Sequence, residues 1–341
     1  MTTMTINLKA MPTRRRFISA AAVSGILAAK PSFAALDSKG GDAYPNKPVK
    51  LIIPFPAGGA TDYAARAIGN ALAQHWQQPV VFDNRVGAGS TIGTEFGAKS
   101  APDGYTLTMG IPAGITIAPH IYPKLGYNPQ EDFEAVAGFA TSPLVLVVPT
   151  TSPFQKFSDV VAYAKANPGK LSYASNGSGS LPHLTMEWFL SQAKVQMVHV
   201  PYRGSAQALP DLISGRVDVM MDIIVSALPF IETGKLRVLA TSGASETSRL
   251  PGTPAIAKLG FPGFASDQWY GLFFPKGTPK ALIQKVQGDV QLVTNDARLR
   301  GLMWQRGAEV RYSSSKSLAE MVKVDSARWA GIAKSTGAKA E

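Results

Sequence analysis

The sequence repeats one local pattern, a short apolar run followed by a glycine-rich turn and a segment with helical spacing. The first copy has an apolar run at residues 49–53, a turn at 54–59, and Thr61 placed to cap the helix that follows. The apolar residues of that helix recur every four positions: Ala64, Ile68, Leu72 and Trp76. Short β-rich runs that alternate with helices predict parallel sheets covered by helices, an α/β architecture.

Three further copies follow the first along the chain. Their apolar runs and turns are residues 79–82 with 87–91, 171–174 with 177–180, and 197–200 with 202–205. A faint internal likeness relates residues 87–90 to 177–180 and 53–55 to 200–202, in reversed order, which indicates pseudo-symmetry rather than a tandem repeat. The chain of 341 residues is long enough for two such sheets.

Two long apolar runs, residues 144–148 and 269–274, are predicted to be strands that cross between the sheets. The helical faces near the end of the chain, around 282–293 and 318–322, then return to the first sheet. We therefore expect one domain of residues 35–145 plus 266–341 and a second of 146–265. Two crossover strands suit hinge closure.

Residues 1–34 have the pattern of an export signal. Arg14, Arg15 and Arg16 precede a weakly apolar run at 17–29, and Ala34 ends a small-residue cleavage site. The paired arginines resemble a twin-arginine signal. The run is too short to span a bilayer, and the mature protein is expected to be soluble and periplasmic, beginning with a linker at 37–43.

Charge and cysteine content exclude several functions. The five basic residues of the leader lower the formal charge from +11 to +6 when they are removed, and the remaining basic residues are scattered, so nucleic-acid binding is not expected. The sequence has no cysteine, which excludes disulfides and a thiol nucleophile.

The glycine turns point to an anion. A turn between a strand and a helix exposes unpaired N–H groups at the positive end of the helix dipole, and glycine permits close approach of a ligand. A single turn of this kind usually only reverses the chain. Several turns drawn from two domains predict a cleft that surrounds a carboxylate.

Several motifs together resemble the Bug family, the receptors of tripartite tricarboxylate transporters. They are Tyr44-Pro45-x-Lys47-Pro48, the stretch 51–62, Asn84-Arg85-x-Gly87-Ala88-Gly89, residues 101–107, Gly177-x-Gly179-Ser180 with His183-Leu184, and Val200-Pro201-Tyr202-x-Gly204. The resemblance implies a two-domain periplasmic-binding-protein fold of type II. It also implies a monomeric, non-enzymatic receptor without metal or cofactor, which holds a small carboxylate for transporter membrane subunits or for sensing.

The resemblance also implies the site residues. Backbone donors are expected from Ala57, Gly58 and Gly59 and from Gly177, Ser178 and Gly179; hydroxyl or loop contacts from Thr91, Ser175, Ser180 and Gly204; and apolar walls from Phe55 and Tyr202. Arg203 is expected to meet a distal carboxylate. Asn176 departs from the family's usual serine or glycine, a difference that bears on ligand choice.

Three polar residues carry two interpretations each. Asp62 either accepts from a ligand ammonium or hydroxyl, or complements the helix dipole from the first turn. His183 either supplies charge to the ligand or packs near a helix start. Asp222 either orients the ligand or holds its loop.

The rival functions lack key residues. Gly87-x-Gly89-x-x-x-Gly93 imitates a dinucleotide fingerprint and keeps an exported NADP oxidoreductase as the alternative, although no acidic or arginine partner ends the next strand. Ser178 lacks the flanking spacing of a hydrolase nucleophile. The four histidines are dispersed and form no zinc motif.

Overall fold

The computed structural model describes residues 44–244 and 246–340, which belong to one compact unit. The expected leader at 1–34 and the linker at 37–43 lie outside the described residues. No helix within the described part of the chain is long and apolar enough to cross a membrane.

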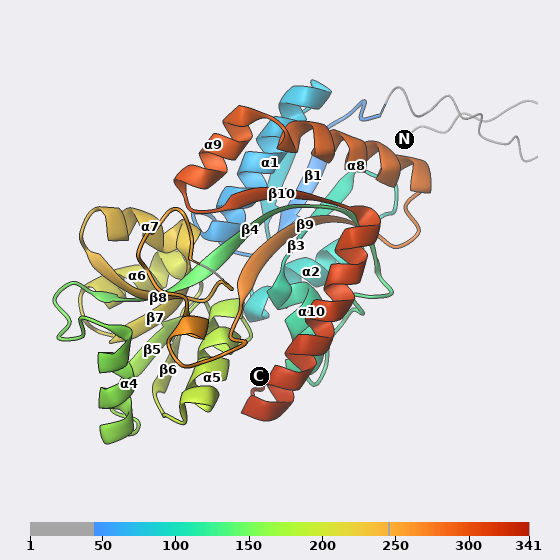
Figure 1. Ribbon diagram of the computed structural model, residues 1–341. Coiled ribbons are helices and arrows are strands. Elements are labelled where there is room, and N and C mark those ends of the chain that lie inside the picture. The colour runs from blue at the N-terminus through green and yellow to red at the C-terminus, as the bar shows by residue number, and fades with distance from the viewer. Residues whose placement is uncertain (1–43, 245, 341) are drawn as a thin grey trace, which may run out of the picture. The chain divides into compact units, whose positions relative to one another are not determined.

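The strands form two sheets that share one long strand, β4 (Figure 1). Sheet A has the order β2 (Val80–Asn84), β1 (Val49–Ile53), β3 (Thr106–Gly110), β9 (Asp267–Pro275), β4 (Phe133–Pro149) and β10 (Glu309–Ser314). Sheet B has the order β8 (Leu236–Thr241), β4, β7 (Val219–Ile223), β5 (Ser172–Ser175) and β6 (Val198–Pro201). We call the parts of the chain built on these sheets the first and second lobes.

Strand β4 passes from one lobe to the other. Its residues 133–143 pair with β9 in sheet A, and its residues 144–149 pair with β7 and β8 in sheet B. The expected crossover at 144–148 therefore begins where β4 enters sheet B. The return connection runs through 242–266, and the apolar run 269–274 lies beyond it, inside sheet A as part of β9.

Each sheet combines parallel and antiparallel strand pairs. The expected parallel pairing holds for β2-β1-β3 and for β6-β5-β7, where strands alternate with helices. The pairs made by β4, and the pair β3-β9, are antiparallel because these strands carry the chain back across the molecule rather than through a right-handed helical crossover.

The two sheets have equivalent strand orders. Sheet A begins β2-β1-β3-β9-β4 and sheet B reads β6-β5-β7-β4-β8, so β5 corresponds to β1 and β6 to β2. The internal likeness in the sequence paired the β1 turn with the β6 turn and the β2 turn with the β5 turn. The topology pairs them the other way, which shows that those short likenesses reflect similar turn chemistry.

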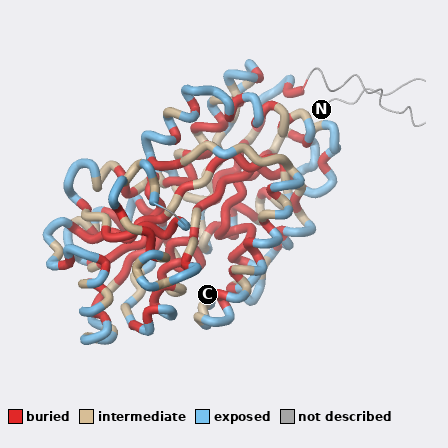
Figure 2. Tube along the Cα trace, in the orientation of Figure 1, coloured by how far each residue is buried: buried red, intermediate tan, exposed pale blue. Residues whose placement is uncertain are grey.

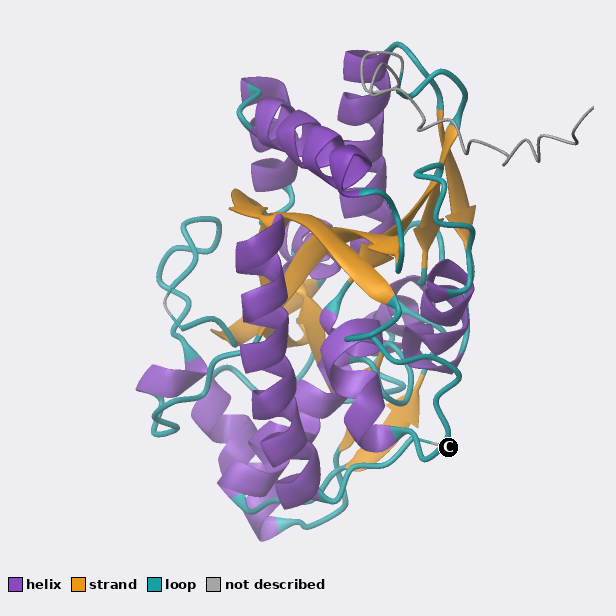
Figure 3. Cartoon of the chain, turned by 90° about the vertical axis from the view of Figure 1, so that its right-hand side faces the viewer, coloured by secondary structure: helices purple, strands orange, loops and turns teal. Residues whose placement is uncertain are grey.

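Helices cover both sheets and bury their apolar faces (Figures 2 and 3). The first lobe carries α1 (Ala60–Trp76), α2 (Thr91–Ala98), α3 (Ala118–Ile121), α8 (Lys280–Thr294), α9 (Ala297–Gln305) and α10 (Ser315–Thr336), and the second carries α4 (Phe157–Ala166), α5 (Leu181–Ala193), α6 (Ser205–Ile213) and α7 (Ile224–Glu232). The predicted face of α1 is buried. Its N-cap is Gly59 without a side-chain bond, so the expectation that Thr61 caps the helix was wrong; Thr61 lies inside the first turn.

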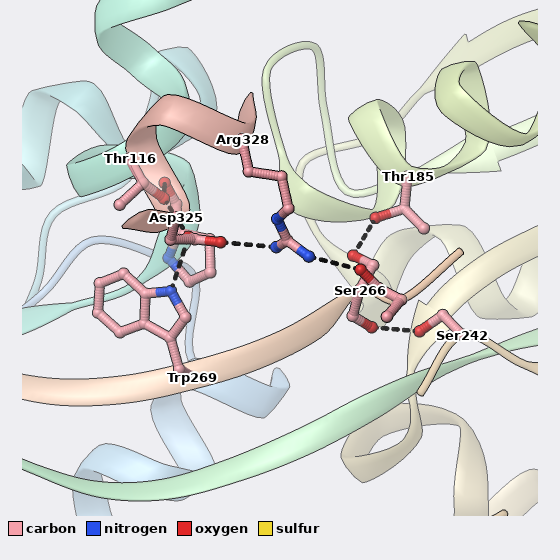
Figure 4. A network of polar contacts seen from close by, with 9 residues as sticks. Thr116, Thr185, Ser242, Ser266, Trp269, Asp325 and Arg328 are labelled. Carbon is pink, nitrogen blue, oxygen red and sulfur yellow. Dashed lines mark hydrogen bonds and ion pairs between the residues drawn. The ribbon is translucent and has the colours of Figure 1, made fainter. Parts of the chain in front are cut away.

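A polar network holds α10 against the return connection (Figure 4). The Asp325 carboxylate accepts hydrogen bonds from Thr116 and from the indole of Trp269, and its other oxygen pairs with Arg328 at 2.6 Å. Arg328 also donates to the carbonyl of Ala265 (2.5 Å). The neighbouring Ser266 continues the network into the second lobe. The connection between the lobes is thereby fastened to the first lobe.

Candidate functional site

The lobes meet at a small cavity, the inner chamber, at the carboxyl ends of the parallel strands. Its lining consists of Phe55, Pro56, Ala57, Gly59, Ala60, Thr61, Ile111 and Ala113 from the first lobe, Asn176, Leu181, Pro182, Gly204, Ser205, Ala206 and Ile223 from the second, and Gln268 from β9. No charged side chain belongs to this set. The carboxyl ends of parallel strands are where open α/β sheets bind ligands.

Helix N-termini from both lobes converge on the inner chamber. The first residues of α1, α5 and α6 all line it. The amides of Ala60 and Thr61 in α1, and of Ser205 and Ala206 in α6, have no hydrogen-bond partner among the described residues. The chamber therefore offers oriented N–H donors and positive helix ends to an anion without any basic side chain.

A second cavity, the outer chamber, adjoins the first. It is lined by Pro54, Phe55, Pro56, Val86, Gly87, Ala88, Gly89, Ser90 and Tyr122 from the first lobe and by Asn176, Gly177, Ser178, Pro201, Tyr202 and Arg203 from the second. Arg203 is its one charged residue. Three residues, Phe55, Pro56 and Asn176, line both chambers and form the junction between them.

The lobes are closed around these chambers. The inner chamber measures about 20 Å³, the room of about one water molecule, whereas the outer measures about 530 Å³. The Tyr122 hydroxyl of the first lobe donates to the carbonyl of Ser178 in the second (3.3 Å). Gly89 lies so near this contact that a Cβ on it would be 2.6 Å from the Ser178 oxygen. A ligand reaches the inner chamber only when the lobes separate.

Asp62 is used within its own loop. Its carboxylate accepts from the Gly58 amide (3.0 Å), from Arg66 (2.9 Å) and from Asn84 (3.0 Å), and the side chain lines neither chamber. Burial favours a raised pKa of this carboxyl, but the bonds from Arg66, Gly58 and Asn84 outweigh it and lower the pKa. Asp62 fixes the turn after β1. It accepts the hydrogen bond of the Gly58 N–H, which the sequence predicted to bind a ligand.

The turn after β5 is likewise braced from inside. The Gly177 amide donates to Ser175 Oγ (3.2 Å), and the Gly179 amide donates to His183 Nδ1 (3.2 Å). The His183 ring stacks on His199 with ring centres 4.1 Å apart. Burial, with a smaller repulsion from His199, lowers the pKa of His183 to about 3, so the ring is a neutral acceptor.

Asp222 lies directly behind the inner chamber. It sits within β7 and is fully buried, and its Oδ1 accepts from Asn176 (3.0 Å) and from Ser205 (2.8 Å). Its Oδ2 has no partner among the described residues. Burial raises the pKa of this carboxyl to about 6 against the opposing hydrogen bonds. Asp222 thus orients two residues of the chamber wall.

The structure divides the predicted site residues into two sets. Phe55, Ala57, Gly59, Gly177, Ser178, Tyr202, Arg203 and Gly204 line the chambers, whereas Gly58, Asp62, Thr91, Ser175, Gly179, Ser180, His183 and Asp222 do not. Thr91 Oγ1 donates to the Ala88 carbonyl, and Ser180 caps α5. Sequence reasoning missed Ser205 and Gln268 as lining residues; the place of Ser205 after Gly204, at a helix start, was the available signal for it.

Two α/β lobes that share a crossing strand and close on a cleft of free helix N-termini define a periplasmic solute-binding protein. The sequence matches the tripartite tricarboxylate transporter family receptor over residues 64–338. The chain belongs to this family, whose members are binding receptors rather than enzymes. The expectation drawn from the sequence motifs is confirmed.

Relatives known from sequence and from solved structures match this chain over most of its length. Protein BugT of Bordetella pertussis is 34% identical over 319 residues, covering 93% of this chain and 97% of that protein. An R. palustris protein solved with adipate is 34% identical with a TM-score of 0.83, covering 86% of this chain and 98% of that one. MatC from Rhodopseudomonas palustris, solved with bound malate, is 31% identical with a TM-score of 0.80, covering 85% and 99%.

Proposed function

We propose that this receptor captures a small dicarboxylate in the two chambers between its lobes. The observation that carries the proposal is the convergence of unpartnered amides from α1 and α6 on an inner chamber without charged side chains. Such a chamber solvates one carboxylate by oriented dipoles. The carboxylates bound in the adipate and malate complexes of the relatives agree with this ligand class.

Arg203 is proposed to hold the second carboxylate. It lies in the outer chamber and makes no ion pair with any described residue, and its own amide is occupied by Gln207. A ligand with carboxylates at both ends passes from the helix termini through the junction at Asn176 to this guanidinium. A monocarboxylate binds only the helix termini and gains nothing from Arg203.

The proposed working cycle couples capture to closure. Residues 35–145 with 266–341 and residues 146–265 act as two domains, and the ligand binds the loops of one before closure adds the donors of the other. The closed monomer then delivers its ligand to the membrane subunits of a tripartite tricarboxylate transporter. Export through the twin-arginine route would follow from Arg15 and Arg16 in the leader. No nucleic acid takes part.

A thermal-shift screen tests the proposed ligand class. The mature chain from Ala35 is titrated with mono-, di- and tricarboxylates and aromatic acids, and with NADP and simple esters as controls. Dicarboxylates are expected to raise the melting temperature in proportion to the logarithm of their concentration. A shift with NADP alone, or no shift with any carboxylate, contradicts the proposal.

A matched pair of glycine variants locates the binding site. Gly59 lines the inner chamber with an ordinary backbone conformation, and its nearest Cβ neighbour would be 3.7 Å away, so Gly59→Leu brings no backbone strain. Its side chain exceeds the room of about one water molecule in the closed chamber, so Gly59→Leu is expected to obstruct closure and to abolish the dicarboxylate-induced shift. Gly288→Leu in α8, where a Cβ meets nothing within 4 Å, is expected to retain the full shift.

A further inference from the structure

Asn176 is the one polar side chain at the junction of the two chambers. The other junction residues, Phe55 and Pro56, are apolar. A dicarboxylate that spans both chambers places the carbon next to its inner carboxylate at this junction. Any substituent on that carbon meets Asn176, which is 7% exposed and therefore fixed in the wall.

Asp222 decides which atom of Asn176 is available. A carboxylate only accepts hydrogen bonds, so the 3.0 Å contact between Asn176 Nδ2 and Asp222 Oδ1 sets the orientation of the amide. The Ser205 hydroxyl lies 2.8 Å from Asp222 Oδ1 and 3.2 Å from Asn176 Oδ1. Because a hydroxyl has one proton, and the shorter contact is to the charged oxygen, Ser205 donates to Asp222. Apart from this longer Ser205 contact, Asn176 Oδ1 has no donor among the residues that the structure describes.

We infer that this receptor selects carboxylates with a hydrogen-bond donor, a hydroxyl or an ammonium, on the carbon beside the inner carboxylate, and that Asn176 Oδ1 accepts from that donor. The inference rests on the proposed function. Asp222 is a positioning residue in it, because it acts through Asn176 and Ser205. A plain dicarboxylate leaves the amide oxygen buried without a partner, and an unpaired buried acceptor weakens binding about tenfold.

Malate, aspartate and succinate share one four-carbon skeleton and differ only in this substituent. Their dissociation constants are measured by calorimetry at pH 8, above the pKa of about 6 of the Asp222 carboxyl, so that it is ionised. Malate or aspartate is expected to bind about tenfold more tightly than succinate. Comparison of malate with aspartate tells whether the donor is a hydroxyl or an ammonium.

Two variants and a control separate selection from structural support. Asn176→Ala is expected to remove the preference, because the donor-bearing acid loses its acceptor and succinate no longer leaves a buried amide oxygen unpaired. Asp222→Asn is expected to bring the dissociation constants of succinate and of the donor-bearing acid closer together. An amide at 222 donates as well as accepts, and this frees the Asn176 amide to rotate. Asp218→Asn is the control, since Asp218 bonds only Ser172 at the start of β5 and is expected to keep the wild-type ratio.

The outcomes distinguish this inference from the proposed function. Equal binding of succinate, malate and aspartate by the wild type overturns the inference and leaves the dicarboxylate site standing. Equal weakening of all three acids in Asn176→Ala also overturns it, since that result indicates loss of wall structure. If none of the three acids, and no longer dicarboxylate, binds the wild type, the proposed function itself fails.

Discussion

Two imidazoles, the buried His183 and the half-buried His199, brace the turn that forms one side of the cleft. His183 accepts from the Gly179 amide, and His199 lies 2.7 Å from Ser175 Oγ, which in turn accepts from Gly177. Both rings are neutral, with pKa values lowered by burial to about 3 for His183 and about 4 for His199. The Gly179 bond persists only while His183 Nδ1 remains unprotonated.

This bracing predicts acid sensitivity with a definite sign. The unfolded chain binds protons on these histidines near pH 6.5 and the folded chain does not, so the free energy of unfolding has its full value above pH 6.5. It is expected to fall as the pH is lowered toward 4, by about 1.4 kcal/mol per pH unit for each histidine. Urea denaturation at several pH values measures the slope.

The variant His183→Asn keeps an acceptor for the Gly179 amide but does not titrate in this range. Between pH 6.5 and 4, the change in its free energy of unfolding with pH is expected to be about half that of the wild type. This holds even if the substitution loses packing that lowers the free energy of unfolding at pH 8. An unchanged slope would show that the acid sensitivity arises elsewhere, for example in the carboxylates.

The sequence predicted where these turns lie but not which acceptors their glycine amides bond. Glycines at 58, 177 and 179 correctly indicated strand-to-helix turns, yet their amides bond Asp62, Ser175 and His183 inside the protein. The amides left for a ligand belong to the residues after the glycines, at the helix starts. Which partner an amide finds depends on side chains brought together by folding, which spacing alone does not reveal.

At the scale of elements, the lobes touch across the mouth of the cleft through Gly89, Tyr122 and Ser178. Gly89 has φ +58°, and a Cβ on it would lie 2.6 Å from the Ser178 carbonyl oxygen and 2.7 Å from the Tyr122 hydroxyl. Gly89→Ala therefore forces the lobes apart at this contact. We expect a dissociation rate of a bound dicarboxylate at least tenfold faster in stopped-flow measurements.

Two further variants test whether the contact between the lobes controls the dissociation rate. Tyr122→Phe removes only the 3.3 Å bond to Ser178 and is expected to speed dissociation about threefold to tenfold. Gly169→Ala carries a similar backbone strain, since Gly169 has φ +70° and open space around its Cβ position, and should leave the rate unchanged. Equal rates in Gly89→Ala and Gly169→Ala would mean that the contact does not hold the closed state.

The elements that the sequence predicted well are those with local signals. The strand–turn–helix copies became β1 to α1, β2 to α2, β5 to α5 and β6 to α6. The first part of β4, residues 133–143, was not predicted, because it is rich in alanine and glycine and contains Pro143. It is a strand because β9 and β10 pair with it from distant parts of the chain. Such long-range pairing also produced the antiparallel strand pairs of both sheets.

At the scale of the whole molecule, the ion pair between the buried Asp325 and the half-buried Arg328 fastens the connection between the lobes. The Asp325 side chain is only 8% exposed, and Arg328 is its charged partner as well as the donor to the Ala265 carbonyl. Thr116 and Trp269 bind the same carboxylate from the first lobe (Figure 4). Removing the guanidinium leaves a buried carboxylate without a cation and releases the connection.

We therefore expect Arg328→Met, which keeps the apolar stem, to lower the free energy of unfolding by about 2–4 kcal/mol in urea denaturation. Arg311→Met is the matched control, because Arg311 pairs with Glu309 at the surface with 70% of its side chain exposed, and such pairs contribute about 0–1 kcal/mol. A large loss of unfolding free energy for Arg328→Met alone would identify the Asp325–Arg328 pair of α10 as a main support of the connection between the lobes. Similar small losses for both variants would show that shared strand β4 is sufficient to hold them.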